Sequence, residues 1–476
     1  MKRPQRSPFE RRLRRWARAA LYGSLALVAA ATALGVRLLE RPLQSSRGEE
    51  WNRVDWATLP EVQLLQDYLR IDTSEPDADE LAGAEFLAAR LAAAGIPATI
   101  ERLAGRRANL WAVLEGEDRR AVVLHHHIDV DPVPDPGQWA FPPFAAQIDG
   151  PWLVGRGAFD MKSVGAAQLQ AFVELARRGK RLRRSVILLA TGSEEVGSDL
   201  GMRWILAHHP ELVERFWALL TEGGVVESRV AGDVKYWGTE FAQRRYLPAV
   251  ACSGSRQRLE ELRRDLLARQ AELTPHLVPE VATFLRAYAG SRDRGELRRS
   301  LAEPAALRDD AAALADLPEH LHDLFFNEAI PGAVEADPAG GFSLPVKLLG
   351  LPGFDRAALE RELLPAWLTF GVRIQVLELD PQAPPSSPLA HPVMTAIGGQ
   401  LAASYPDAPR GPWIPAYAVT DARFVRPAGV PTFGFAPFPL VVSDPLRTAS
   451  VNEQIALPAY VEGVRLYIAL LDRLTD

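Results

Sequence analysis

The chain has 476 residues, of which 47% are hydrophobic and 24% are charged, and its formal net charge is −6. This length is too great for one compact core, so we expect two domains with additional segments. The mildly acidic charge gives no reason to expect nucleic-acid binding, and the single cysteine, Cys252, excludes an intrachain disulfide and a zinc site built from several thiolates.

The first forty residues differ from the rest of the chain. A strongly basic segment, 1–18, precedes Ala19–Val36, which carries no charge and consists mostly of Ala, Leu and Val. At 1.5 Å per residue, this run is just long enough to cross a bilayer core of about 30 Å. We expect a single-pass anchor with its basic end in the cytoplasm and the remaining chain on the periplasmic or extracellular side. A cleaved signal peptide, which would release a secreted protein, is the alternative because Ala29–Ala33 is rich in small residues.

Helical and extended patterns alternate after a polar linker at 37–58. Helical spacing predicts helices at Glu80–Ala94, Ser163–Arg178 and Leu200–His208. Apolar runs predict strands at Ile96–Ile100, Asn109–Leu114, Ala121–His127, Ser185–Thr191 and Phe216–Leu220. Continuous apolar runs are typical of strands that are covered on both faces of a sheet. The alternation predicts an α/β fold with a mostly parallel sheet covered by helices over 59–243.

The pattern changes near Arg244. Charged segments with helical character lie at Arg256–Gln270, Val278–Ala289 and Arg308–Leu324. A proline-rich stretch at 381–388 is followed by a predicted helix at His391–Ser404, an apolar run at Val430–Ala436 and a long amphipathic helix at Pro458–Leu474. The simplest architecture is one α/β domain, formed by 59–243 and 381–476, that is interrupted by an inserted domain at 244–380.

A histidine ends one of the predicted strands. His127 closes 121–127, and Asp129 follows two residues later on the same side of an extended chain. A carboxylate there can hold the imidazole tautomer and orient the ring toward a metal. A lone buried histidine is more often a core residue fixed by hydrogen bonds, and we expect that structural role for His125, on the side of His127, and for His126, which points the other way.

Acidic residues follow other strands and turns. Asp160 lies in the glycine-flanked turn GRGAFDMK, although an aspartate before a helix often serves only as an N-cap. Glu194 and Glu195 follow 185–191; a solvated acidic loop is the simpler interpretation, but such a pair can divide metal binding from proton transfer. Glu222 precedes a Gly-Gly turn after 216–220. Because the ends of parallel strands meet at one edge of a sheet, we expect these groups to converge on a zinc site.

Six motifs occur in a fixed order: HHIDVDPVP at 126–134, WAFPPFAAQIDGPWLVGRGAFDMK at 139–162, TGSEEVGSDLGM at 191–202, LLTEGG at 219–224, TDARF at 420–424 and VNE at 451–453. In this order they resemble the zinc-dependent aminoacylase/carboxypeptidase family, which includes carboxypeptidase S, carboxypeptidase G and succinyl-diaminopimelate desuccinylase, and they are most similar to carboxypeptidase S. The resemblance implies a zinc-exopeptidase fold whose inserted α+β domain serves as lid and dimerisation domain, hence a homodimer. It also implies hydrolysis of an amide bond in a peptide or an N-acyl amino acid.

The resemblance further implies a role for each candidate residue. A first zinc would be bound by His127, Asp160 and Glu222. Asp160 would bridge to a second zinc, to which Glu195 belongs. Glu194 would be the general base that takes a proton from water, and Asp129 would orient His127.

Three features depart from the family pattern. The family's last zinc-binding histidine, four residues before the glutamate of VNE, is replaced by Ala449. Tyr246–Gln257 lacks the histidine that helps to stabilise the oxyanion, and removing one such donor costs about 100- to 1,000-fold in turnover. Thr221 replaces the aspartate that aminoacylases often have before Glu222.

Two hypotheses follow from these departures. The chain is a metal-dependent amidohydrolase with one well-formed zinc site and an altered second site, or it is a catalytically degenerate, membrane-anchored relative with a binding or structural role. We favour the enzyme, because the acidic cluster is complete.

Overall fold

A computed structural model of the protein describes residues 54–133, 135–230, 233–291, 295–337, 340–377, 384–416, 418–441 and 450–476. The predicted anchor at 19–36 and the substituted position Ala449 lie outside these residues. Among the residues that are described, no helix combines the length and the apolar character that a membrane span requires.

The larger sheet contains ten strands in the described part of the chain. They are β1 (Ala98–Arg102), β2 (Ala108–Leu114), β3 (Asp118–His127), β6 (Arg184–Thr191), β7 (Phe216–Thr221), β8 (Val225–Val230), β9 (Asp233–Glu240), β15 (Arg410–Trp413), β16 (Thr432–Gly434) and β17 (Pro439–Val441). Their order is β1-β2-β6-β3-β7-β16-β9-β8-β17, with β15 beside β9. Parallel pairing joins β6, β3, β7 and β16 at the centre. Antiparallel pairing joins β1 to β2 and β2 to β6 on one side, and β16 to β9 and β9 to β8 on the other. The sheet is therefore mixed, and the predicted parallel order holds for its centre.

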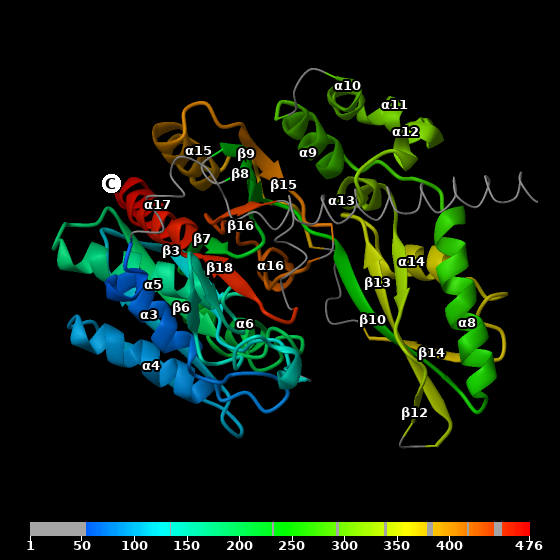
Figure 1. Ribbon diagram of the computed structural model, residues 1–476, viewed down its shortest axis with the longest axis horizontal. Coiled ribbons are helices and arrows are strands. Elements are labelled where there is room, and N and C mark those ends of the chain that lie inside the picture. The colour runs from blue at the N-terminus through cyan, green and yellow to red at the C-terminus, as the bar shows by residue number, and fades with distance from the viewer. Residues whose placement is uncertain are drawn as a thin grey trace, which may run out of the picture. The chain divides into compact units, whose positions relative to one another are not determined.

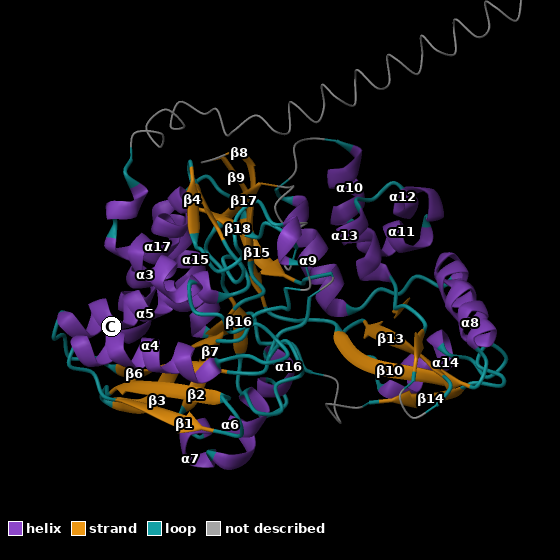
Figure 2. Cartoon of the chain, turned by 60° about the horizontal axis from the view of Figure 1, so that its bottom comes forward, coloured by secondary structure: helices purple, strands orange, loops and turns teal. Residues whose placement is uncertain are grey.

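Helices cover both faces of the central strands. They are α3 (Pro60–Leu69), α4 (Glu80–Ala93), α5 (Lys162–Arg177), α6 (Met202–His208), α7 (Pro210–Val213), α15 (Pro392–Ser404), α16 (Ala422–Val425) and α17 (Leu457–Thr475). Figure 2 shows α5 and α17 on one side of β3 and β6, and α6 and α7 on the other. Successive residues of β3 serve the two faces: Val123 belongs to the core under α6, while the ring of His126 lies against Gly165 of α5.

A second, antiparallel sheet falls within the predicted insertion. Its strands are β10 (Arg245–Ser253), β11 (Glu328–Pro331), β12 (Glu335–Ala336), β13 (Phe342–Gly350) and β14 (Arg373–Val376), in the order β11-β13-β10-β14 with β12 beside β13. Leucines of α8 (Arg256–Arg269) and α14 (Arg356–Leu363) pack on this sheet in one apolar core. Figure 1 shows α8 alongside β13 and β10. This arrangement is of the α+β type that was expected; the domain boundaries themselves stay a prediction.

A run of short helices lies between α8 and β11 in the chain. They are α9 (Pro279–Ala289), α10 (Glu296–Ala302), α11 (Pro304–Asp309), α12 (Ala311–Ala315) and α13 (Glu319–His322). The segment with helical character expected at 308–324 is divided into short helices, because Asp310 caps a new start by accepting from the amides of Ala312 and Ala313 at 3.1 Å, and Pro318 opens another. Although α9 lies within the predicted insertion, its Phe284 packs on Trp413 of the larger sheet, with ring centroids 5.0 Å apart.

The remaining elements are small. A three-stranded sheet joins β18 (Gln454–Ala456), β5 (Trp152–Val154) and β4 (Gln147–Asp149), in that order. Single 3₁₀ turns occur at Trp56–Thr58, Pro136–Gln138, Gln270–Glu272 and Asp323–Phe325. The small sheet ties the C-terminal segment to the loop between β3 and α5.

Candidate active site

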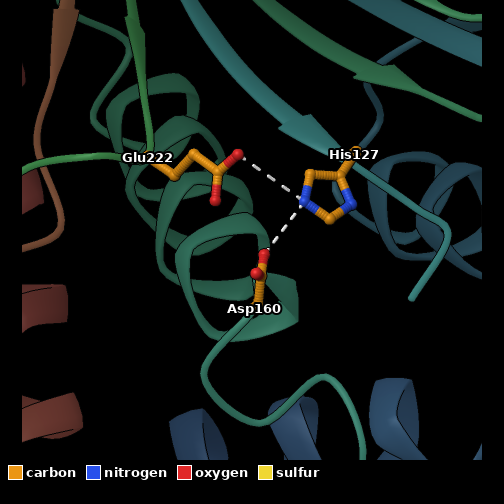
Figure 3. A group of neighbouring side chains, drawn as sticks. All are labelled: His127, Asp160 and Glu222. Carbon is orange, nitrogen blue, oxygen red and sulfur yellow. Dashed lines mark hydrogen bonds and ion pairs between the residues drawn. The ribbon is translucent and has the colours of Figure 1, made fainter. Parts of the chain in front are cut away.

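Three predicted ligands meet at the end of the central strands. His127 is the last residue of β3, Glu222 directly follows β7, and Asp160 lies in the turn before α5. His127 Nε2 is 3.1 Å from Asp160 Oδ1 and 3.7 Å from Glu222 Oε1, and one ligand atom from each of the three residues lies within 4.8 Å of the others. Figure 3 shows both carboxylates pointing at the same imidazole nitrogen. Parallel pairing of β3 with β7 brings two of these groups together, as the topology predicts.

The backbone holds the imidazole of His127 in place. Its Nδ1 donates to the carbonyl oxygen of Asp129 at 2.8 Å, whereas the Asp129 carboxylate is 3.7 Å away. The sequence prediction assigned this orienting contact to the carboxylate, and the structure assigns it to the carbonyl of the same residue. Because a carbonyl only accepts, Nδ1 carries the hydrogen, and in the neutral ring Nε2 is left with a lone pair facing Asp160 and Glu222.

The electrostatics of this group call for a positive charge. Burial lowers the pKa of His127, but the hydrogen bond to Asp160 and the charge of Glu222 outweigh it and hold the pKa well above its ordinary value. Burial raises the pKa of Asp160, yet the contact with His127 prevails and lowers it. When no metal is bound, the raised pKa of His127 favours an imidazolium beside Asp160, while burial, and then the charge of Asp160, raise the pKa of Glu222 well above its ordinary value.

Glu194 and Glu195 lie in the loop after β6. The Glu194 carboxylate accepts a hydrogen bond from Arg423 Nη2 at 3.4 Å. Burial raises the pKa of Glu194 to about 7, although the charge of Arg423 opposes the shift. A buried carboxyl with a pKa near the working pH suits proton transfer.

Glu195 lies outside the group of three whose ligand atoms lie within 4.8 Å of one another. Its backbone amide donates to the Asp129 carboxylate at 3.0 Å, and its side chain shares a hydrogen bond with Asp131. Burial, and then the charge of Asp160, raise its pKa to about 11. The second predicted metal position is therefore less fully assembled than the first.

His125 and His126 occupy structural positions, as predicted. His125 Nδ1 is 3.0 Å from the Thr221 hydroxyl, and its Nε2 is 2.9 Å from the Thr191 hydroxyl. His126 Nε2 is 3.3 Å from the hydroxyl of Tyr68. Thr221, one of the departures from the family pattern, is thus a partner of a core histidine.

Sequence reasoning missed several polar residues near the site. Asp131 lines a cavity of about 400 Å³ together with Trp139, Arg156 and Ser450. Arg423 reaches Glu194 from the four-residue helix α16. TDARF contains Arg423 and HHIDVDPVP contains Asp131, so their places in these motifs were the available signals.

The chain is similar to several known proteins. The sequence profile described as "Peptidase family M20/M25/M40" matches residues 123–473. Aminoacylase-1 of Mus musculus is 25% identical over 427 residues, which cover 88% of this chain and 96% of that protein. Succinyl-diaminopimelate desuccinylase of Dinoroseobacter shibae is 38% identical over 136 residues, 28% of this chain and 35% of that protein. The fold is shared with the M20 family metallo-carboxypeptidase Sso-CP2 from Sulfolobus solfataricus, at a TM-score of 0.66 and 16% identity over 87% of this chain and 99% of that chain.

Proposed function

This chain belongs to peptidase family M20/M25/M40, as its motifs predicted, and from that premise we propose that it hydrolyses an amide bond with a bound zinc ion and Glu194 as general base. The relatives named above are an aminoacylase, a desuccinylase and a metallo-carboxypeptidase. The substrate class that we propose for this chain is accordingly a peptide or an N-acyl amino acid, cleaved beside a free carboxylate.

One observation carries the proposal. His127 directs Nε2 at two carboxylates, while the hydrogen on Nδ1 is committed to a backbone carbonyl. With Nδ1 held by this carbonyl, Nε2 is the atom left to bind a cation once its proton is lost. A core histidine, such as His125, has both ring nitrogens within hydrogen-bonding distance of hydroxyl groups instead.

The residues present fit a zinc ion. One imidazole and two carboxylates, from His127, Asp160 and Glu222, are ligands that zinc accepts, and they leave a fourth position open for water or substrate. The raised pKa of His127 supports the same view, because the hydrogen bond to Asp160 and the charge of Glu222 both favour a positive charge at this position. Asp160 and Glu195 would contribute to a second ion, if one binds.

Each group then has a distinct task. A bound zinc ion would polarise the scissile carbonyl and make water acidic enough to ionise near neutral pH. Glu194 takes the proton of the attacking water on a carboxylate oxygen and passes it to the departing amide nitrogen. Arg423 holds the Glu194 carboxylate in place through Oε1, and the Asp129 carbonyl keeps the His127 ring aligned.

The rival hypothesis is a degenerate family member that binds without catalysis. It rests on the two histidines that the sequence lacks, at Ala449 and within Tyr246–Gln257. We further propose that 19–36 anchors the chain, with the catalytic residues on the non-cytoplasmic side, and that the insertion mediates a homodimer. Neither proposal affects the chemistry of His127 and Glu194.

Metal content and hydrolysis together test the proposed function. We expect about one zinc per purified chain, and hydrolysis of some members of a panel of N-acyl amino acids and dipeptides. Glu194→Gln should keep its zinc and lose about 100- to 10,000-fold in kcat. A protein that binds zinc but is as inert as Glu194→Gln would establish the degenerate relative; one that binds no zinc contradicts the metal centre itself.

A further inference from the structure

Glu453, in the C-terminal VNE motif, has a fully buried carboxylate that accepts four hydrogen bonds from the turn that carries Asp160. Its Oε2 accepts from Arg156 Nη1 at 2.8 Å and from the Gly157 amide at 3.0 Å. Its Oε1 accepts from the amides of Phe159 and Asp160 at 2.8 and 2.9 Å. The Glu453 side chain, 293 positions after Asp160, therefore holds three backbone amides of the turn, including that of Asp160 itself.

The backbone around Glu453 strengthens this attachment. The carbonyl oxygen of Glu453 accepts from the Gly155 amide at 2.9 Å, and β18 then continues as an antiparallel partner of β5. The neighbouring Asn452 accepts from the Ala140 amide at 2.7 Å through its side-chain oxygen. Two consecutive residues of the motif thus fasten two separate stretches of the loop between β3 and α5.

The turn has little freedom to take another conformation while it contacts Glu453. Gly157 has a φ of +83°, and a Cβ there would lie 2.8 Å from Val130 Cγ1. Arg156, which donates to Glu453, also donates to the carbonyl oxygen of Pro132 at 3.1 Å and lies over the ring of Trp139. The donors converge on one carboxylate because the glycine lets the backbone turn inward.

We propose that Glu453 is the positioning residue of the metal centre: it fixes the turn that sets Asp160 against His127, so the C-terminal segment supports metal binding by hydrogen bonds instead of by a ligand. The metal-binding half of this inference rests on the proposed function, since it takes Asp160 as a metal ligand. Groups that orient metal ligands in this way typically change metal affinity by 10- to 100-fold when they are removed.

This assignment accounts for a contrast within the C-terminal motif. The chain retains Asn452 and Glu453 but has alanine at 449. Holding the turn requires the Glu453 carboxylate, and holding the stretch at Ala140 requires the Asn452 side chain; neither requires a histidine at 449. The motif can therefore keep its role in holding the loop without supplying a metal ligand.

The test compares Glu453→Gln and Glu453→Ala with a matched control, Glu227→Ala, in the full-length protein. Glu227 is also a largely buried carboxylate with a cationic partner, Lys235 at 2.6 Å, and it lies on β8, which β7, β16 and β9 separate from β3. In metal-free protein, hydrogen–deuterium exchange of peptides covering 155–162 should become about tenfold faster in Glu453→Ala, since hydrogen bonds to a charged group typically contribute a factor of this size.

Zinc affinity, measured by competition with a chromophoric chelator, completes the experiment. Glu453→Ala should bind zinc about 10- to 100-fold more weakly. Glu453→Gln should bind with intermediate affinity, because its amide keeps one acceptor but turns a donor toward Arg156 and Gly157, and Glu227→Ala should match the wild type. If exchange at 155–162 is unchanged in Glu453→Ala, the inference is overturned, whether or not the wild type binds zinc. If the wild type binds no zinc, that result contradicts the proposed function alone. Faster exchange with wild-type zinc affinity would reduce Glu453 to a structural role and also overturn it.

Discussion

Arg423 and Glu194, which are 229 positions apart, meet as a buried ion pair with Arg423 Nη2 3.4 Å from Glu194 Oε1. The two side chains are only 6% and 9% exposed, so their charges are poorly screened by solvent. Burial raises the pKa of Glu194 to about 7, and the guanidinium of Arg423 opposes that rise. The ion pair therefore lowers the pH at which the proposed general base becomes competent.

Removing the charge of Arg423 should move the pH–rate profile. A general base acts when it is deprotonated, so kcat/KM rises with pH through the Glu194 pKa. Without the guanidinium the carboxylate loses a favourable charge, its pKa increases, and the acidic limb of the profile moves to higher pH. We expect Arg423→Gln to lose most activity at pH 6 and to recover part of it at pH 8, as measured by kcat/KM on one substrate.

Arg423→Lys serves as the control for this prediction, because it keeps a positive charge near Glu194 and should shift the limb less. An acidic limb that stays in place in Arg423→Gln, with activity reduced equally at every pH, would contradict electrostatic control of Glu194 by Arg423.

Zinc binding should release protons from the protein. The pKa of His127 is held well above its ordinary value, so the metal-free site is protonated at pH 7 and must lose that proton before Nε2 binds a metal. We expect at least one proton to be released for each zinc bound at pH 7, since the pKa of Glu222 is raised as well, and an affinity that falls as the pH drops. Isothermal titration in buffers of different ionisation enthalpy measures this number; heats that do not depend on the buffer would show that His127 is neutral before zinc arrives.

Much of the central sheet could be predicted from local pattern. The continuous apolar runs predicted β3 and β6, and the two-residue period of a strand placed His126 on the face opposite His125. Glu222 could be placed near His127 because parallel strands end at one edge. The proximity of His127, Asp160 and Glu222, the proposed metal ligands, follows from these regularities together with the family motifs.

The parts that escaped prediction depend on contacts between distant segments. Glu453 directly precedes the three-residue strand β18, and Arg423 lies in the four-residue helix α16. Both elements are too short to produce a periodic pattern. The antiparallel strands β8 and β9 pair through backbone groups whose partners a sequence does not specify. Asp310 looked like one more charged residue in a helical stretch, whereas its side chain caps the helix that starts after it.

Arg244 should be a major contributor to stability. Its guanidinium, 1% exposed, donates to the Glu328 carboxylate at 2.5 Å and to the carbonyl oxygens of Ala416, Phe326 and Leu349. Arg244→Met would leave Glu328 buried without this partner, and breaking a buried pair in this way costs about 3–5 kcal/mol. The free energy of unfolding in urea should fall by that amount.

Two variants make the prediction for Arg244 specific. Adding Glu328→Gln to Arg244→Met should recover part of the loss, because the unpaired charge is then absent. Arg102→Met removes a surface pair with Glu85, whose side chains are 62% and 48% exposed, and should cost less than about 1 kcal/mol. A loss for Arg244→Met as small as that for Arg102→Met would be inconsistent with a buried pair that matters.

Restoring a histidine at position 449 should complete the second metal position. The family motif places its last zinc ligand there, and the neighbouring Ser450 lines a cavity together with Asp131, whose side chain shares a hydrogen bond with Glu195. Because Asp160 and Glu195 already supply carboxylates, an added imidazole would provide the nitrogen ligand that the second ion lacks. We expect Ala449→His to raise the zinc content from about one ion per chain toward two, measured by elemental analysis after dialysis against trace zinc.

Ala449→Gln, which is of similar size but is a poor zinc ligand, should leave the zinc content at the wild-type value. If the histidine variant also stays there, the second position is limited by the arrangement of Glu195 and Asp131 rather than by the missing imidazole.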